Sequence, residues 1–433
     1  MHSAAHSPVE VDCPAGTVLG TLDSTAGVRR FHSVPFSRIA APFNDALPAA
    51  GGMLIDATSP RPSATALSLT TPADARPGSD LPVMVFIHGG RFEEGSHADP
   101  RTNAAAFAAH GVIQVQLGYR LKLPGLARFT DDAPSHYRAV HDCQLGLEWV
   151  QRNIESFGGD PTNVTLVGQS AGAAVALWLT RRDHYRGGFR RLLAMSPAFP
   201  RSGYASRKPV IRAAVGAALT RDRLNALHAR SPEKLERAYR RIRATYFTDM
   251  ALGPAPLEPA ELAEVDMVVT STREEMLPTC ARSDGWGMGP ATVRVAGPGM
   301  ALRPSRARRY ARAVGAFDGH HLGGHLVGDS IIRRWVDAVS ESAPGRVWQA
   351  EIVSAAGPVH HSGELDAVFG TGRFAAGEGL NGWLLDFCRG RLPGWPEYRT
   401  DDAPGRQVLR AEVSGTSCEV VTDPLGHVRR AFG

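Results

Sequence analysis

The pentapeptide Gly168-Gln169-Ser170-Ala171-Gly172 is the strongest indication of the fold. It follows an apolar, strand-like run at residues 163–167 and precedes a run of small and apolar residues, 173–179, that predicts a helix. A serine on such a strand-to-helix turn takes a strained backbone conformation, and glycines two residues to either side let neighbouring backbones approach. The turn therefore predicts that the Ser170 hydroxyl stands exposed above a sheet, beside the backbone N–H of Ala171.

The same alternation of strand and helix extends over most of the chain. Apolar runs bounded by glycine and proline are typical of buried strands in a mostly parallel sheet. They lie at residues 82–88, 112–119, 163–167, 191–195, 264–270 and 349–354. Residues 133–157 predict a helix that Gly158-Gly159 ends. We therefore expect an α/β fold with a central, mostly parallel twisted sheet flanked by helices.

Two helical stretches interrupt this alternation. We expect one domain over residues 1–433, with lid-like helical insertions at about 200–260 and 300–345. The first insertion is rich in arginine. In the second, Gly323-Gly324 should interrupt the helix.

The composition excludes several classes of protein. Hydrophobic residues make up 43% of the 433 residues and charged residues 21%, which excludes a disordered chain. No apolar run approaches the roughly 20 residues that a membrane helix needs. Residues 1–13 lack the apolar core of a secretory signal. We therefore expect a cytoplasmic protein with no membrane partner.

Charge and cysteine content exclude further partners. All but three of the 48 basic residues are arginine, and they are spread along a chain with 43 acidic residues. This distribution gives no reason to expect a nucleic-acid partner. The five cysteines form no C-x-x-C pair, which favours neither a disulfide framework nor a thiolate metal site. Three histidines within residues 319–325 lie among glycines, without a further ligand in the pattern. We expect neither a metal nor an organic cofactor.

A second glycine-rich turn, His88-Gly89-Gly90-Arg91, ends the predicted strand at residues 82–88. Acyl transfer requires N–H donors aimed at the oxygen that becomes negative in the tetrahedral intermediate. A glycine-rich loop upstream of the serine can supply two donors, and the residue after the serine supplies a third. We therefore predict an oxyanion hole formed by the N–H groups of Gly90, Arg91 and Ala171.

A serine hydroxyl becomes an effective nucleophile only beside a base that an acidic group orients. In chains with this type of turn, the order along the sequence is serine, acid, histidine. The fifth predicted strand is followed by Glu274 and Glu275, and the sixth by His360 and His361. Spacing alone does not choose within either pair.

These motifs resemble the type B carboxylesterase family, which includes cholinesterases and bacterial para-nitrobenzyl-type esterases. The resemblance runs over nearly the whole chain. It is most specific at residues 157–173, which are close to that family's signature around its nucleophile, and extends to residues 118–121 and 147–154. It implies an α/β-hydrolase fold, here with a shortened helical lid.

The resemblance also distinguishes within the two pairs. The run Thr272-Arg273-Glu274-Glu275 matches the family's segment ending in its acidic residue, which implies that Glu275 is the acid. The family's histidine lies three residues before a glutamate that Glu364 matches, which implies that His361 is the base. The implied catalytic triad is Ser170, Glu275 and His361.

Two departures from the family pattern affect the site. Arg91 stands where the family usually has glycine or alanine, and Met276 replaces the glycine after the acid. The segments between the triad residues are also shorter than in familiar members, and the loss falls in the lid. The resemblance therefore does not imply a substrate preference. Because Arg91 places a cation beside the site, an anionic ester is one possible substrate.

The residues support three alternative functions. The first is a serine carboxylester hydrolase, which acts on a small-molecule ester through an acyl-enzyme intermediate. The second is an acyltransferase or cyclase that uses the same triad in a biosynthetic pathway. The third is a non-catalytic binding protein on the same fold, against which the complete triad argues.

Overall fold

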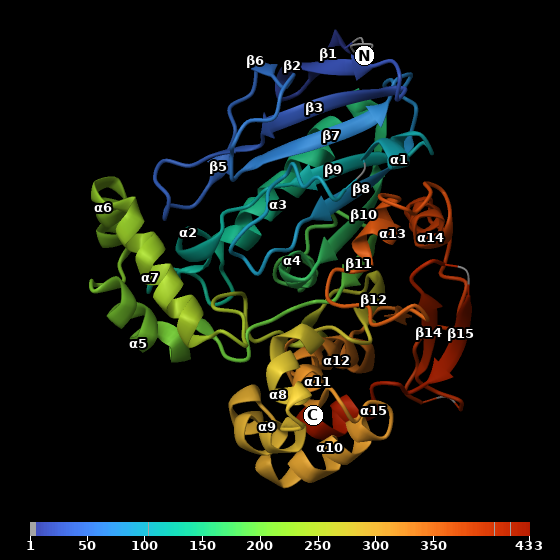
Figure 1. Ribbon diagram of the computed structural model, residues 1–433. Helices are drawn as coiled ribbons and strands as arrows, with labels where there is room; N and C mark the ends of the chain where they lie inside the picture. The colour runs from blue at the N-terminus through green and yellow to red at the C-terminus, as the bar shows by residue number, and fades with distance from the viewer. Residues whose placement is uncertain (1–5, 103, 402, 416) are drawn as a thin grey trace.

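The computed structural model describes residues 6–102, 104–401, 403–415 and 417–433. Within these ranges the centre of the molecule is a twisted sheet of 13 strands (Figure 1). Twelve of them follow the order β1-β2-β3-β7-β9-β8-β10-β11-β12-β13-β14-β15, and β6 pairs with β2.

The strands of this sheet and of a small second sheet have the following bounds: β1 (His6–Cys13), β2 (Gly16–Asp23), β3 (Val28–Pro35), β4 (Ser37–Arg38), β5 (Leu47–Pro48), β6 (Met53–Asp56), β7 (Ala66–Pro72), β8 (Leu81–Ile87), β9 (Ile113–Leu117), β10 (Gly159–Gln169), β11 (Arg191–Met195), β12 (Asp266–Thr272), β13 (Val347–Val353), β14 (Gln407–Glu412) and β15 (Cys418–Thr422). Pairing is parallel from β9 through β8 and β10 to β14. The strands β1, β2, β3 and β7 and the last strand β15 pair antiparallel. This architecture confirms the predicted α/β class with a mostly parallel sheet.

The α-helices have the following bounds: α1 (Ala104–Ala108), α2 (Lys122–Leu126), α3 (Arg138–Asn153), α4 (Ala171–Leu179), α5 (Tyr204–Val215), α6 (Arg221–Arg230), α7 (Pro232–Thr245), α8 (Ala281–Gly285), α9 (Gly289–Ala296), α10 (Ala307–Gly315), α11 (Leu322–Gly328), α12 (Arg334–Ser342), α13 (Leu365–Phe369), α14 (Gly379–Cys388) and α15 (Gly426–Phe432). None of the helices in the described ranges is long and apolar enough to cross a lipid bilayer.

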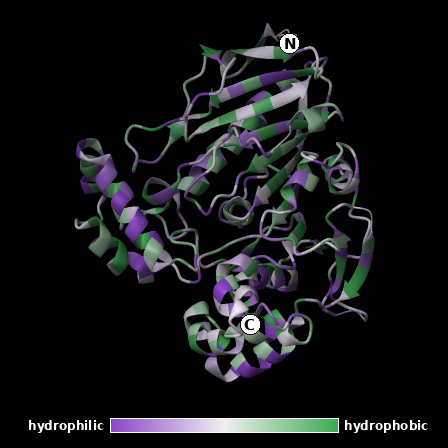
Figure 2. Ribbon diagram, viewed as in Figure 1, coloured by the Kyte–Doolittle hydropathy of each residue, from purple (hydrophilic) through white to green (hydrophobic). Residues whose placement is uncertain are grey.

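Both faces of the central strands are covered, as their continuous apolar sequence requires. Along β11, Leu192 and Ala194 join one hydrophobic cluster with α4, while Leu193 and Met195 join a second with α14. Figure 2 shows hydrophobic residues concentrated in these strands and hydrophilic stretches along α6 and α7. The helices on the two faces leave the carboxyl ends of the parallel strands uncovered, and the loops that follow these strands lie there.

Helices α5 to α7 and α8 to α12 project beyond the sheet as two separate groups (Figure 1). The predicted interruption at Gly323-Gly324 is wrong, because α11 runs through both glycines. The N–H groups of Gly323 and Gly324 donate to the Asp284 carboxylate at 2.9 Å each. A helix begins without acceptors for its first N–H groups, so this carboxylate stabilises the start of α11.

Candidate active site

The turn at Ser170 joins β10 to α4 with strained backbone angles. Ser170 has φ 55° and ψ −117°, a region that few residues other than glycine adopt. The flanking glycines permit this turn: a Cβ atom at Gly172 would lie 2.1 Å from the Ile87 carbonyl oxygen, and one at Gly168 would lie 2.5 Å from the Gly172 carbonyl oxygen. The Ser170 N–H donates to the Met195 carbonyl oxygen at 2.8 Å, which ties the turn to β11.

The loop after β8 packs directly against this turn. A Cβ atom at Gly89 would lie 2.3 Å from Gln169 Oε1, so only glycine fits there. Gly90, Arg91 and Phe92 follow with φ values of 102°, 57° and 62°. Phe92 is fully buried, which anchors the end of this left-handed run.

Of the predicted oxyanion-hole residues, Gly90 and Arg91 line the cavity that contains Ser170. Ala171 is fully buried and begins α4, so its N–H belongs to the first helical turn, where no intrahelical acceptor exists. The loop after β8 and the start of α4 thus both border Ser170.

Loops from three strands bring Ser170, His361 and Glu275 together. The Ser170 hydroxyl lies 2.8 Å from His361 Nε2, and His361 Nδ1 lies 2.7 Å from Glu275 Oε2. The His361 N–H also donates to the Glu275 carbonyl oxygen at 2.9 Å, which fixes the two loops relative to each other. Since a carboxylate only accepts hydrogen bonds, Nδ1 carries the proton and Nε2 is free to accept the serine proton.

The neighbours Glu274 and His360 are placed differently. His360 Nδ1 lies 3.1 Å from the Glu274 carbonyl oxygen, and Glu274 Oε2 accepts the Val359 N–H at 3.4 Å. Hydrogen bonds to Ser170 from this part of the chain therefore involve His361 and not His360.

The pKa of His361 reflects opposing influences. Burial alone would lower it, but the hydrogen bond to Glu275 and the negative charges of Glu275 and Glu364 outweigh burial, so the His361 pKa lies above its usual value. The imidazolium that forms when His361 takes a proton from Ser170 is stabilised by the same charges.

Sequence reasoning missed four residues that support the triad. Ser196, which follows β11, donates to Glu275 Oε1 at 2.6 Å, and that oxygen also accepts the Thr272 N–H at 2.8 Å. Gln169 donates to the Ser362 hydroxyl at 2.8 Å beside His361. The signal for Ser196 was its position at the carboxyl end of a predicted strand, whereas nothing in the sequence pairs residues 169 and 362.

The Arg91 side chain turns toward the first group of helices. Its Nη2 donates to the Asp249 carbonyl oxygen at 2.8 Å, and its Nε lies 3.7 Å from Glu93 Oε1. Glu93 also pairs with Arg243 of α7 at 2.9 Å. Burial lowers the pKa of Arg91. These contacts join the loop after β8 to the segment that follows α7.

The cavity around Ser170 has a volume of about 440 Å³ and opens to solvent. Its charged lining includes Arg91, Glu94, Asp99 and Arg101, and the last two form an ion pair at 2.7 Å. The charges of the lining therefore balance. In the described residues no group of three or more histidine, cysteine, aspartate or glutamate side chains has a metal-binding arrangement.

Sequence comparison places residues 65–276 in the carboxylesterase family. The chain is 32% identical over 237 residues to a para-nitrobenzyl esterase of Bacillus subtilis (strain 168), a match that covers 50% of this chain and 48% of that protein. It is 33% identical over 190 residues to lipase 4 of Diutina rugosa, which covers 40% and 35% of the two chains. The chain thus spans about half the length of the first relative and about a third of the second.

Structural comparison extends the likeness over the whole chain. A para-nitrobenzyl esterase structure superposes with a TM-score of 0.76 at 22% identity, covering 98% of this chain and 99% of the other. A carboxylesterase from Geobacillus stearothermophilus gives a TM-score of 0.79 at 21% identity, covering 98% and 100%. At such identities the likeness establishes the α/β-hydrolase fold.

Proposed function

Because the chain belongs to the carboxylesterase family through residues 65–276, we propose that it is a serine carboxylester hydrolase acting on small-molecule esters. The observation that carries this proposal is the hydrogen-bonded series Ser170 Oγ, His361 and Glu275, at 2.8 and 2.7 Å. A serine hydroxyl, an imidazole and a buried carboxylate in this order form the constellation that activates a serine for attack on a carbonyl carbon.

In the first half of the proposed reaction, Ser170 Oγ attacks the ester carbonyl while His361 Nε2 accepts its proton. The carbonyl oxygen becomes negative and is bound by the N–H groups of Gly90, Arg91 and Ala171, which are fixed by backbone packing before substrate arrives. His361 then gives the proton to the leaving alkoxide, and an acyl group stays on Ser170.

In the second half, water attacks the acyl group and His361 accepts one of its protons. The same N–H groups hold the second tetrahedral intermediate. As it collapses, the proton passes from His361 to Ser170 Oγ, the carboxylic acid leaves and the enzyme is regenerated. Throughout, one carboxylate oxygen of Glu275 accepts the Nδ1–H hydrogen bond, and the other accepts from the Ser196 hydroxyl and the Thr272 N–H.

We further propose that the two groups of helices, α5–α7 and α8–α12, act as a lid beside the cavity. Contacts of Arg91 with Asp249 and Glu93 support this role for the first group, since they couple it to the oxyanion loop. They also occupy the guanidinium, so recognition of an anionic ester by Arg91 stays a prediction. Cytoplasmic location and the lack of nucleic-acid partners stay predictions as well.

The decisive experiment compares the wild-type protein with Ser170→Ala on p-nitrophenyl acetate. We expect kcat to fall by several orders of magnitude, with the residual rate due to binding and the oxyanion hole alone. A fluorophosphonate probe should label the wild type only. Equal labelling of the variant would mean that another serine is the nucleophile. Product analysis with an added alcohol acceptor separates hydrolysis from acyl transfer.

A further inference from the structure

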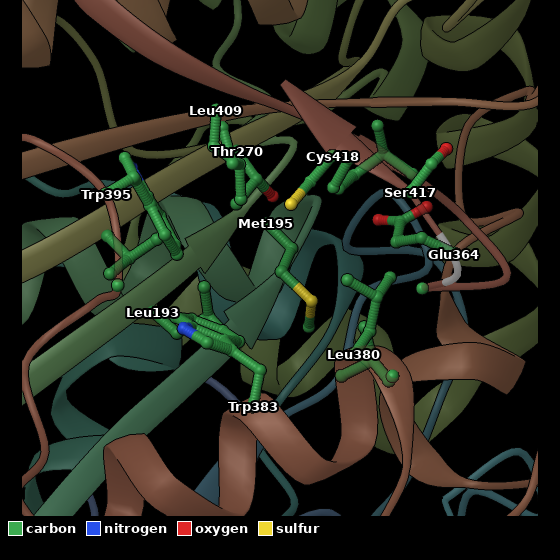
Figure 3. Close-up of a pocket in the computed structure, with 18 residues that line it drawn as sticks. Leu193, Met195, Thr270, Glu364, Leu380, Trp383, Trp395, Leu409, Ser417 and Cys418 are labelled. Carbon is green, nitrogen blue, oxygen red and sulfur yellow. The ribbon is translucent and has the colours of Figure 1, made fainter. Parts of the chain in front are cut away.

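A second cavity, of about 260 Å³, lies between the sheet and α14 (Figure 3). In the described part of the chain, no residue lines both this cavity and the one around Ser170. This volume is close to the lower end of the range of small-molecule sites, about 300–1,000 Å³. The exposed residue Cys418 lies on its lining, so a ligand can enter from solvent.

The walls of this cavity are almost entirely apolar. One wall consists of side chains from one face of β11 to β14, including Leu193 and Met195. The opposite wall comes from α14, with Leu380 and Trp383, and from Trp395. Two indole rings and aliphatic side chains suit a ligand with an aromatic or alkyl body.

Glu364 brings a carboxyl group to this lining, which within the described ranges otherwise has only the small polar side chains of Thr270, Ser417 and Cys418. Its side chain is only 1% exposed, and neither carboxylate oxygen has a hydrogen-bond partner among the described residues. Figure 3 shows Glu364 beside Ser417 on one side of the cavity and Trp395 on the other. Burial, followed by the charge of Glu275, raises the pKa of Glu364 to about 7. A buried carboxyl without a partner is costly, and a ligand that supplies one gains the corresponding free energy.

We propose that this cavity is a binding site for a hydrophobic amine, whose aromatic or alkyl body packs against Trp383 and Trp395 and whose ammonium group donates to Glu364. An ionised carboxylate only accepts hydrogen bonds, and an ammonium supplies both the opposite charge and the N–H donors. An anionic ligand of the same shape is repelled, and a neutral one supplies no charge.

The test measures binding of 1-naphthylmethylammonium to the full chain by titration calorimetry at about pH 8, where Glu364 is largely ionised. We expect the dissociation constant to rise at least about tenfold in Glu364→Gln, since one charge-assisted contact is lost. Two analogues serve as controls: the neutral 1-naphthylmethanol and the anion of 1-naphthaleneacetic acid. Each should bind the wild type at least as weakly as the amine binds Glu364→Gln.

A matched control is Glu94→Gln, which removes a carboxylate from the lining of the other cavity. It should leave binding of the amine unchanged. Leu380→Trp fills the cavity and keeps Glu364. We expect it to abolish binding of the amine, and unchanged binding would contradict the proposal even if Glu364→Gln does not fold.

Three results overturn the proposal: equal affinity in wild type and Glu364→Gln, loss of binding in Glu94→Gln instead, or equal affinity for the amine and the alcohol. None of these measurements uses ester hydrolysis. Failure of the amine site is therefore distinguishable from failure of the proposed function.

Discussion

At the scale of single residues, the charge of Glu275 sets the working pH range of His361. The hydrogen bond and charge of Glu275 raise the pKa of His361 against the effect of burial. Only neutral His361 can accept the serine proton, so activity rises as pH passes the raised pKa. We expect Glu275→Gln to lower kcat by about 10³–10⁴-fold and to move the acid limb of kcat/KM to lower pH. The measurement is a pH–rate profile with p-nitrophenyl acetate.

The control for this prediction is Glu274→Gln. It removes the same charge one residue earlier, but the Glu274 carboxylate accepts from the Val359 N–H instead of from His361. Its acid limb should stay close to that of the wild type. If both variants shifted the limb equally, general charge rather than the contact at 2.7 Å would set the His361 pKa.

Glu364 makes the stability of the fold depend on pH. Its pKa rises from a usual value near 4.5 to about 7 in the folded state, so folding favours the protonated form. As pH rises through that window, the unfolded chain ionises first and the folded state loses stability, by on the order of 3 kcal/mol for one such group. We expect the melting temperature of Glu364→Gln, relative to wild type, to be higher at about pH 8 than at about pH 5. A difference independent of pH would show that Glu364 ionises normally.

At the scale of elements, α11 shows how a distant side chain overrides a local signal. Glycine disfavours helix interiors, yet Gly323 and Gly324 lie in the first turn of α11. A Cβ atom at Gly324 would lie 2.6 Å from Leu277 Cα, so close packing requires glycine there. Asp284, about 40 residues earlier in the chain, accepts both N–H groups.

This arrangement predicts the effect of Asp284→Ala. Removing the carboxylate leaves two buried N–H groups without their acceptor. We expect the free energy of unfolding to fall by about 1–2 kcal/mol, as for the loss of other helix caps. Urea unfolding measures it. The exposed Asp222 in the first turn of α6 provides a comparison, since Asp222→Ala leaves in place the cap of that helix, which is the Thr220 side chain. Equal losses would argue against the capping role.

The other elements show which parts of a fold the sequence specifies. The apolar run at residues 191–195 coincides with β11, and the glycine after residue 157 ends the preceding helical segment with φ 93°. Such elements follow from local pattern. The candidate site could be predicted only in part from the sequence. Chain order leaves two adjacent glutamates as candidates for the acid and two adjacent histidines as candidates for the base. The contacts of Ser196 with Glu275 and of Gln169 with Ser362 could not be predicted, because they join strands and loops that meet only in the folded chain.

At the scale of the whole molecule, buried charge at Asp249 joins the helical groups to the sheet. Its carboxylate pairs with Arg207 of α5, which is almost fully buried, and accepts the backbone N–H of Arg201. The Arg201 guanidinium reaches Ser330, which follows α11, at 2.6 Å. The Asp249 carbonyl oxygen accepts from Arg91 of the loop after β8. Asp249 thus contacts the first helical group and the loop after β8 directly, and it is linked to the second helical group through Arg201.

Asp249→Asn tests this coupling, because it keeps the shape of the side chain and removes its charge. The buried Arg207 guanidinium then lacks its counter-charge, and breaking a buried pair from one side costs about 3–5 kcal/mol. We expect a lower melting temperature and a lower kcat on neutral esters, since the segment that holds Arg91 loses its anchor.

The matched control is Asp131→Asn, whose carboxylate is 67% exposed and pairs with Arg221. Exposed pairs contribute about 0–1 kcal/mol, so this control should change little. If the two variants behaved alike, Asp249 would not couple the helical groups to the site. If Asp249→Asn lowered stability but left kcat unchanged, the oxyanion loop would be held by its own packing around Phe92 instead.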